Sequence, residues 1–406
     1  MKVRLIAAGF ALVLTGCPGG GGAAKLKLGS MLSLTGSLGG VGQEQLQAAN
    51  LAVQEINRAG GVVGQSITIE NKDDGTDETK AKTAADAFVK EGIPVVIGAT
   101  GSSKCVSALG ELGPKGIPMI SASCTSPELT TSDPTGTFFR TLPPDTLQGK
   151  LLSERAVQKH FTKVAILNVG DTYGTPLSNE FETAFKATAG NTVLVHHQYT
   201  EGQSDYTSDI NSLFAAGAPE AILLVAYPED AAKMIKNFKA GTHAGEGTFW
   251  FFSDALDDPG FVSAAGSNLF TFQHEGTYPG TPAGSRYDTY KSAYKTVYGV
   301  DSVEGDQGVN AYDAVYLAAL AMEAGKATTA DAVKTNLLAV SKGGTKYGPT
   351  EYKQAAADAK AGKDIDFEGA SGNLDMDDSG DVVGPYDIWH VTSAGDIVYT
   401  ERSITP

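Results

Sequence analysis

The stretch of sequence that decides the fold begins at residue 26. It reads LKLGSML at 26–32, SLTGSLGGVG at 33–42 and QEQLQAANLAVQEINRA at 43–59. In the last piece, apolar residues recur at steps of three and four: Leu46, Ala49, Val53 and Ile56. This spacing gives a helix one apolar face. A short apolar run followed by an amphipathic helix is the first half of a βαβ unit, so the stretch predicts a parallel sheet covered by helices.

The same alternation continues along the chain in two series. In the first series we expect strands at 26–32, 66–70, 94–98 and 118–121, with helices at 43–59, 79–91 and 103–112. The second series has strands at 164–169, 192–198, 221–225 and 249–252, with helices at 176–188, 206–215 and 228–238. Helices at 284–298, 307–323 and 329–340 and a hairpin at 386–391 and 396–402 follow. The chain repeats an architecture rather than a sequence.

Length and charge agree with two α/β domains and exclude some functions. A chain of 406 residues is too long for one ordinary core. The formal net charge is −16, and an acidic surface repels phosphate backbones, so we expect no nucleic-acid partner. The chain contains no G-x-S-x-G and no G-x-x-x-x-G-K-[ST] motif, so hydrolase and P-loop chemistry have no support.

Three further motifs resemble sites for other chemistry, but none matches the required pattern. The glycines at 36–42 are spaced G-x-x-G-G-x-G, which is not the dinucleotide fingerprint. The run DMDDSGD at 375–381 resembles a calcium loop, but its twelfth position is Tyr386 instead of Glu, so we expect a tight turn. His196 and His197 are sequential on a predicted strand and therefore point to opposite faces. We expect no cofactor, no metal site and no catalytic residues.

The segment FFRTLPPD at 138–145 lies between the two series. Its two prolines exclude a helix and predict an extended crossover. A connection back to the first domain and a last return to the second would add further crossings. Several crossings of this kind make a hinge.

The first residues predict export and a lipid anchor. Lys2 and Arg4 precede an apolar run at 5–14, and LTGC ends at Cys17. The run is too short to span a bilayer, and the whole segment resembles a bacterial lipobox. We expect a signal peptide at 1–16, a lipid on Cys17 and a flexible tether at 17–25, which makes the protein extracytoplasmic and membrane-anchored. A plain secretory signal is the alternative.

Cys105 and Cys124 form an even pair once Cys17 is set aside. Because an exported protein folds in a disulfide-permissive compartment, we favour a bridge between them. Two small buried thiols are the alternative.

Several ordered blocks carry a resemblance to one family. They are MLSLTGSLGGVG (31–42), VVIG (95–98), GIPMISASCTSPELT (116–130), FRTLPPDTLQG (139–149), DTYG (171–174) and GNLDMDDSGDVVGPYDIWHV (372–391). The chain resembles type I periplasmic binding proteins of the leucine/isoleucine/valine class. The resemblance implies two α/β lobes that close on a small ligand, delivery to an ABC permease, no catalysis and a monomer. It places lobe 1 at 26–142 and 276–384, and lobe 2 at 143–275 and 385–406.

Two turns that bear hydroxyl groups predict where a ligand carboxylate docks. Ser102 and Ser103 lie between the third strand and its helix, and Ser123, Cys124 and Thr125 follow the next strand. Ligands of open α/β sheets sit beyond the carboxyl ends of strands, where helix N-termini attract anions. The resemblance assigns the contact to Ser102 and Thr125. Helix caps or local turns are the alternative roles of these residues.

Two acids and two tyrosines complete the predicted site. Asp145 and Asp254 match family acids that face a ligand ammonium, a charge that needs an anion when buried. Alternatively, each one caps the helical segment that follows it. Tyr173 and Tyr227 match family positions that cover the ligand when the lobes close. Val41 stands where leucine-type proteins can carry a large aromatic residue, which leaves a roomier pocket.

These residues predict a solute-binding protein of an ABC importer for a branched-chain or other uncharged amino acid. No Arg or Lys lies at 38–42 to pair an acidic ligand side chain, which disfavours glutamate. A ligand-sensing subunit without transport is the alternative function. An enzyme with a nicotinamide cofactor ranks third.

Overall fold

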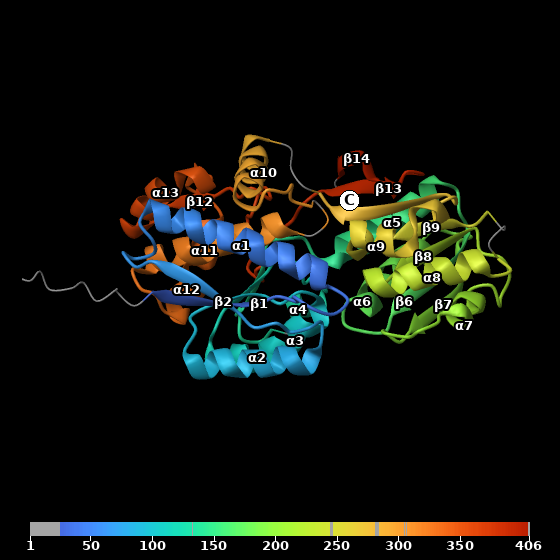
Figure 1. Cartoon of the computed structure of the whole chain (residues 1–406), viewed down its shortest axis with the longest axis horizontal. Coiled ribbons are helices and arrows are strands. Elements are labelled where there is room, and N and C mark those ends of the chain that lie inside the picture. Colours follow the sequence, from blue (N-terminus) through green and yellow to red (C-terminus); the bar gives the residue numbers. More distant parts are fainter. Residues whose placement is uncertain are drawn as a thin grey trace, which may run out of the picture.

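The computed structural model describes residues 25–131, 133–243, 247–280, 284–303, 305 and 307–404. The predicted signal peptide, Cys17 and the tether up to residue 24 lie outside the described residues. Figure 1 shows two lobes arranged along the long axis, each built on its own sheet. The predicted fold class, two α/β lobes with mainly parallel sheets, is therefore confirmed.

The sheet of the first lobe has five parallel strands in the order β2-β1-β3-β4-β5. They are β1 (Leu26–Met31), β2 (Ile67–Asn71), β3 (Val96–Gly98), β4 (Met119–Ser121) and β5 (Phe138–Arg140). Neighbouring residues of a strand point to opposite faces, so Met119 and Ile120 pack into different apolar clusters. Because both faces of the sheet are covered, its central strands β3 and β4 are buried along their whole length.

Helices cover both faces of this sheet. On one face lie α2 (Glu78–Glu91) and α3 (Ser102–Leu112), and on the other α1 (Gly39–Ala59) with α11 (Gly308–Gly325). Helix α11 is apolar on all sides because it packs against α1, α12, α13 and the sheet. The lobe also contains α4 (Glu128–Thr131), α10 (Ser285–Tyr298), α12 (Ala330–Ser341), α13 (Tyr352–Lys360) and a parallel pair, β11 (Thr345–Tyr347) and β12 (Ile365–Phe367).

The sheet of the second lobe has seven strands in the order β14-β13-β10-β9-β8-β6-β7. Five run parallel: β6 (Lys163–Val169), β7 (Thr192–Tyr199), β8 (Ala221–Val225), β9 (Phe249–Phe252) and β10 (His274–Pro279). The predicted hairpin, β13 (Tyr386–Val391) and β14 (Ile397–Ile404), is present and adds two antiparallel strands beside β10.

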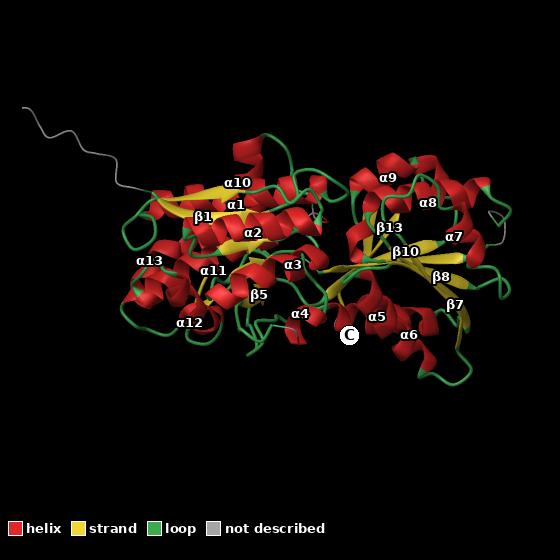
Figure 2. Cartoon of the chain, turned by 90° about the horizontal axis from the view of Figure 1, so that it is seen from below, coloured by secondary structure: helices red, strands yellow, loops and turns green. Residues whose placement is uncertain are grey.

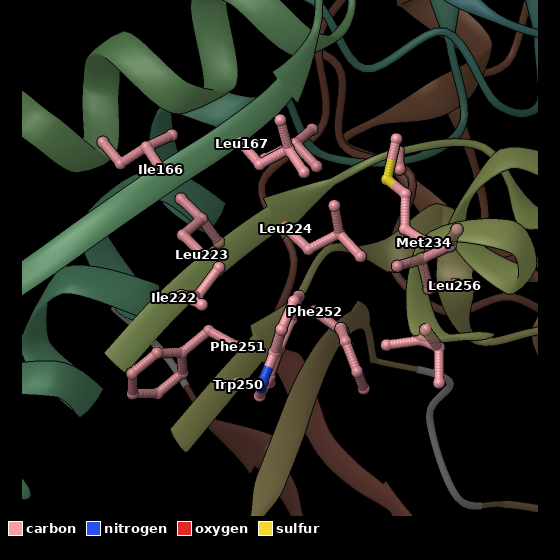
Figure 3. Close-up of a cluster of buried hydrophobic side chains, with 14 of the residues drawn as sticks. Ile166, Leu167, Ile222, Leu223, Leu224, Met234, Trp250, Phe251, Phe252 and Leu256 are labelled. Atoms are coloured by element: carbon pink, nitrogen blue, oxygen red, sulfur yellow. The ribbon is translucent and has the colours of Figure 1, made fainter. Parts of the chain in front are cut away.

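Helices enclose the second sheet as well. Figure 2 shows α5 (Asp145–Gln158) and α6 (Gly174–Lys186) on one side, with α8 (Pro228–Ala240) and α9 (Pro259–Ala265) on the other. Helix α7 (Thr207–Ser212) packs against α8. Between the strands and α8 lies an apolar core in which Leu224, Met234 and Phe252 are fully buried (Figure 3). Short 3-10 helices occur at Gly113–Lys115, Asp254–Leu256, Ser267–Leu269 and Pro349–Glu351.

The chain passes between the two sheets three times: from β5 to α5, from β10 to α10 and before β13. The crossing segments bond to one another and to α11. The Gly280 N–H donates to the Pro385 carbonyl at 2.7 Å, and the Asn310 side-chain amide donates to the Thr141 carbonyl at 2.6 Å. Several crossing segments between two lobes are typical of a hinge.

Some elements differ from the sequence-based expectation. The helix expected at 206–215 is shorter, and the crossover at 138–145 begins as the edge strand β5. Strand β10 was not predicted because HEGTYP has little apolar character, and its pairing partners come from distant segments. It also runs to Pro279, past the lobe boundary predicted at 275/276. The other lobe boundaries stay a prediction.

Candidate functional site

A cavity lies between the two lobes, with about 410 Å³ of space free of protein atoms, part of it open to solvent. A cleft between two domains is a common place for a small-ligand site. Lobe 1 contributes Leu38, Val41, Thr100, Gly101, Ser102, Ser123, Gly305 and Gln307, and lobe 2 contributes Tyr173, Tyr227, Asp254 and Ala255. Several elements meet here because the carboxyl ends of both parallel sheets face the gap between the lobes.

The wall from lobe 1 consists of the two predicted turns, joined by hydrogen bonds. Gly101 precedes α3 with a φ of 92°, a conformation that glycine adopts without strain. The Ser126 N–H donates to the Ser102 hydroxyl at 3.1 Å, and the Gly101 N–H lies 3.4 Å from the Ser123 hydroxyl oxygen. The first N–H groups of α3 lack partners within the helix, so this wall attracts a negative charge.

Cys105 and Cys124 form the predicted disulfide, with their Cα atoms 6.5 Å apart. The alternative of two free buried thiols is therefore wrong. The bridge ties the first turn of α3 to the turn after β4. It fixes Ser102 relative to Ser123 and Thr125.

Arg140, at the end of β5, holds the same turn from behind. Its side chain is fully buried, and Nη1 donates to the carbonyl oxygens of Cys124 at 3.1 Å and Ser126 at 2.9 Å. Nε donates to Asp381 at 2.6 Å. The guanidinium therefore links the turn to the segment that crosses between the lobes, a role that no sequence signal indicated.

The two predicted acids are both buried. Asp145 is fully buried, and its carboxylate oxygens form no well-aligned hydrogen bond among the described residues, although the nearby Thr125 hydroxyl favours the charged form. Burial and the nearby Asp254 raise the pKa of Asp145 well above its usual value. Asp254 accepts a hydrogen bond from the Tyr173 hydroxyl at 2.6 Å, and burial raises its pKa too. Once one of two neighbouring buried carboxyl groups is ionised, ionisation of the other is disfavoured.

Other buried polar atoms near these acids also lack partners among the described residues: the Thr125 and Ser253 hydroxyls and the Gln148 carbonyl oxygen. Such atoms are costly unless something bonds to them. Neither acid occupies the N-cap position of the helix that contains it. Pro144 is the N-cap of α5, so Asp145 is already inside the helix, and Ser253 precedes the short helix that contains Asp254.

Tyr173 and Tyr227 stand side by side in the wall from lobe 2. Their rings are stacked, with centroids 5.7 Å apart and planes inclined by 21°. The Tyr227 hydroxyl donates to Asp171 at 2.7 Å, and burial raises the pKa of both phenols well above the ordinary value. Both rings therefore stay neutral and present an apolar surface to the cavity.

The structure separates the predicted residues into two groups. Val41, Ser102, Ser123, Tyr173, Tyr227 and Asp254 line the cavity, whereas Ser103, Cys124, Thr125 and Asp145 do not. Sequence analysis missed Leu38, Thr100, Gly101, Ala255, Gly305 and Gln307. Thr100 and Gly101 follow a predicted strand end, which was an available signal. Gly305 and Gln307 precede α11 and reach the cavity through tertiary structure alone.

The motifs set aside in the sequence have structural roles. His196 bonds to Glu182 of α6 and His197 to Asp209 of α7, so the two rings point to opposite faces, as predicted. The run at 375–381 forms the expected tight turn, in which Asp377 accepts from the N–H groups of Ser379 and Asp381. Within the described ranges, no three His, Cys, Asp or Glu side chains are grouped to hold a metal ion.

Residues 44–394 match the family model described as "Receptor family ligand binding region". The chain belongs to this family. Family membership and fold together make it a type I periplasmic binding protein. None of its helices in the described part of the chain is long and apolar enough to cross a membrane.

Relatives within the family include named amino-acid-binding proteins. The Leu/Ile/Val-binding protein BraC3 of Rhizobium johnstonii is 28% identical over 326 residues, which cover 77% of this chain and 83% of that protein. A leucine-, isoleucine-, valine-, threonine- and alanine-binding protein of Pseudomonas aeruginosa is 29% identical over 52% of this chain and 56% of its own length.

Solved structures of other proteins share the fold. The branched-chain amino acid transporter substrate-binding protein LivJ of Streptococcus pneumoniae, in complex with isoleucine, has a TM-score of 0.78 and 21% identity, covering 94% of this chain and 100% of its own. A solute-binding protein of R. palustris in complex with benzoate has a TM-score of 0.74 and 18% identity, covering 94% and 97%. At such identities the likeness shows the fold alone.

Proposed function

We propose that this family member captures a free amino acid with an uncharged side chain and delivers it to an ABC importer. The observation that carries the proposal is a pair of buried acids in lobe 2: Asp254 lines the cavity, and Asp145, whose oxygens form no well-aligned hydrogen bond among the described residues, lies close to it. A cation placed between them relieves both the repulsion and the lost hydrogen bonds. The ammonium of an amino acid is such a cation.

The opposite wall suits the rest of the amino acid. The helix N-terminus at Ser102 and the hydroxyl of Ser123 offer donors to the carboxylate. Leu38, Val41 and the two tyrosine rings supply an apolar surface for the side chain. A carboxylate without an amine, such as benzoate, would leave the two acids unpaired.

Import also needs a place at the membrane and a permease. We propose that Cys17 carries a lipid after removal of residues 1–16, and that the two lobes act as a monomer on the extracytoplasmic side. Lobe 2 then comprises residues 143–275 and 385–406 together with the rest of β10. The transporter named with the structural neighbour LivJ supports delivery to a permease, and the LTGC sequence at 14–17 supports the lipid on Cys17. Radioactive leucine uptake by cells that lack the protein separates import from sensing, because a sensor leaves uptake unchanged.

The test of the ligand class uses three compounds of one shape. L-leucine carries both charges, 4-methylpentanoate lacks the amine and 3-methylbutylamine lacks the carboxylate. We expect calorimetry to detect binding of L-leucine or a similar amino acid. At a ligand concentration of a hundred times the Kd, the free energy of unfolding should rise by about 2.7 kcal/mol. Equal binding of 4-methylpentanoate would contradict the role of the acids.

A further inference from the structure

Outside the cavity, the two lobes touch again at the rim of the cleft. Ser37, in the turn before α1 of lobe 1, donates its hydroxyl to Glu201 of lobe 2 at 2.7 Å. Glu201 follows β7, and 164 residues of sequence separate the pair. A contact between lobes that lies away from the three crossings exists only while the lobes are together.

A second rim contact involves Lys104 in the first turn of α3. Its side chain is 2% exposed, although lysine almost never becomes fully buried without a partner. The ammonium lies 4.9 Å from the centre of the Tyr227 ring of lobe 2 and donates to the neighbouring Ser103 hydroxyl at 3.2 Å. A desolvated cation over an aromatic ring is a favourable contact.

Tyr227 connects the rim to the cavity. Its ring lines the cavity, stacks on Tyr173 and is held by the Tyr227 hydroxyl on Asp171, all within lobe 2. Lys104 is the lobe 1 group beside that ring. Separation of the lobes would remove the ring from the ammonium and expose both to water.

We propose that Ser37, Lys104, Glu201 and Tyr227 form a rim latch that stabilises the closed form and slows ligand release. Within it Lys104 is a positioning residue, because it acts on the ligand through the Tyr227 ring. The effect on ligand rests on the proposed function, whereas the effect on lobe closure does not. A ligand enters the open form, so contacts that exist only in the closed form change the release rate more than the association rate.

The kinetic test uses L-leucine and rapid-mixing fluorescence or surface plasmon resonance. Lys104→Met keeps the packing of the stem and removes the charge, and we expect release to become about fivefold faster with little change in association. Lys104→Arg keeps a cation and should restore the slow release. Ser37→Ala should speed release about threefold, because it removes one hydrogen bond.

Matched controls carry the same changes at exposed sites. Lys82→Met on α2, whose side chain is 65% exposed, and Glu229→Gln on α8, 63% exposed, should leave both rates unchanged. In a background of Tyr227→Leu, Lys104→Met should have a smaller effect on release, with the remainder coming from the attraction between Lys104 and Glu201. Additive effects in this cycle would overturn the coupling between Lys104 and the ring.

A second measurement needs no ligand. Spin labels at Lys90→Cys in lobe 1 and Lys186→Cys in lobe 2, both on exposed side chains, report the distance between the lobes by pulsed electron resonance. We expect Lys104→Met and Ser37→Ala to shift the ligand-free protein toward longer distances. Identical distance distributions in all variants would overturn the rim latch.

The two measurements distinguish the two proposals. If L-leucine and the other amino acids fail to bind the wild type while Lys104→Met still lengthens the distances, the proposed function fails and the latch stands. If L-leucine binds and leaves every variant at the same rate, the latch fails and the proposed function stands. Should Lys104→Met not fold, Ser37→Ala and Glu201→Gln carry the same test.

Discussion

The two sides of the cavity are built in opposite ways. On the side proposed to bind the ligand carboxylate, a disulfide, a buried guanidinium and several hydrogen bonds hold the turns of Ser102 and Ser123 in place. On the side proposed to bind the ammonium, Asp145 is buried beside Asp254 without a well-aligned hydrogen bond among the described residues. The first side is organised before a ligand arrives. On the second side, the buried acids are unfavourable without a partner, so a bound cation would stabilise the protein.

This contrast predicts that affinity and stability respond in opposite directions on the ammonium side. Asp145→Asn removes one charge of the buried acid pair proposed to hold the ligand ammonium, so we expect a loss of about 2 to 5 kcal/mol in L-leucine binding by calorimetry. Asp313→Asn is the matched control, since Asp313 is equally buried but accepts hydrogen bonds from Ala370 and Ser371. It should reduce stability and spare affinity. Unchanged affinity in Asp145→Asn would remove the basis of the proposed ligand class.

On the carboxylate side, the disulfide should matter for stability and for geometry. Replacing Cys105 and Cys124 together by Ser opens a loop with a sequence separation of 19. The chain-entropy model gives a loss of about 3 kcal/mol in the free energy of unfolding. Urea unfolding measures it, and reduction of the wild type with dithiothreitol should give the same shift. If loss of the disulfide changes neither the free energy of unfolding nor the affinity for leucine, the disulfide does not preorganise this side of the cavity.

Closure of the two sides on each other should depend on Gly305. A Cβ atom there would lie 1.6 Å from the Asp257 carbonyl oxygen of lobe 2. Gly305→Ala should therefore prevent full closure and weaken L-leucine binding by about 1 to 3 kcal/mol. Small-angle scattering should show compaction with leucine in the wild type and in Gly110→Ala, where the added atom meets open space. The same compaction in Gly305→Ala would refute this contact.

The pH dependence of stability should sharpen the contrast further. Because burial raises the pKa of Asp145 in the folded protein, the neutral carboxyl is favoured there. The stability that the neutral Asp145 carboxyl contributes is fully present at pH values below its pKa in the unfolded chain. This stability is lost as the pH rises through its pKa in the folded protein. Asp145→Asn is neutral at every pH, so in the absence of ligand its stability relative to the wild type should increase from pH 4 to pH 8. Thermal unfolding of both proteins across this range measures the difference, and a constant difference would contradict the buried charge.

The amino-acid sequence by itself determined the local elements of this protein. Strands such as Ala221–Val225 and Phe249–Phe252 and the hairpin strand Tyr386–Val391 occur where their apolar patterns predicted them. Strand ends also located Ser102 and Ser123, because the carboxyl ends of parallel strands meet at one edge. These features depend on the periodicity of neighbouring residues, which a sequence displays directly.

Only the tertiary structure decided which residues share the cavity and what each one bonds to. Gly305 and Gln307 come from the segment before α11, and Lys104 was not recognised although it lies two residues after Ser102. Asp145 could have been a helix cap, and its unpartnered state depends on what surrounds it. Burial and hydrogen bonding between residues far apart in the chain are properties of the packed fold, so no local pattern encodes them.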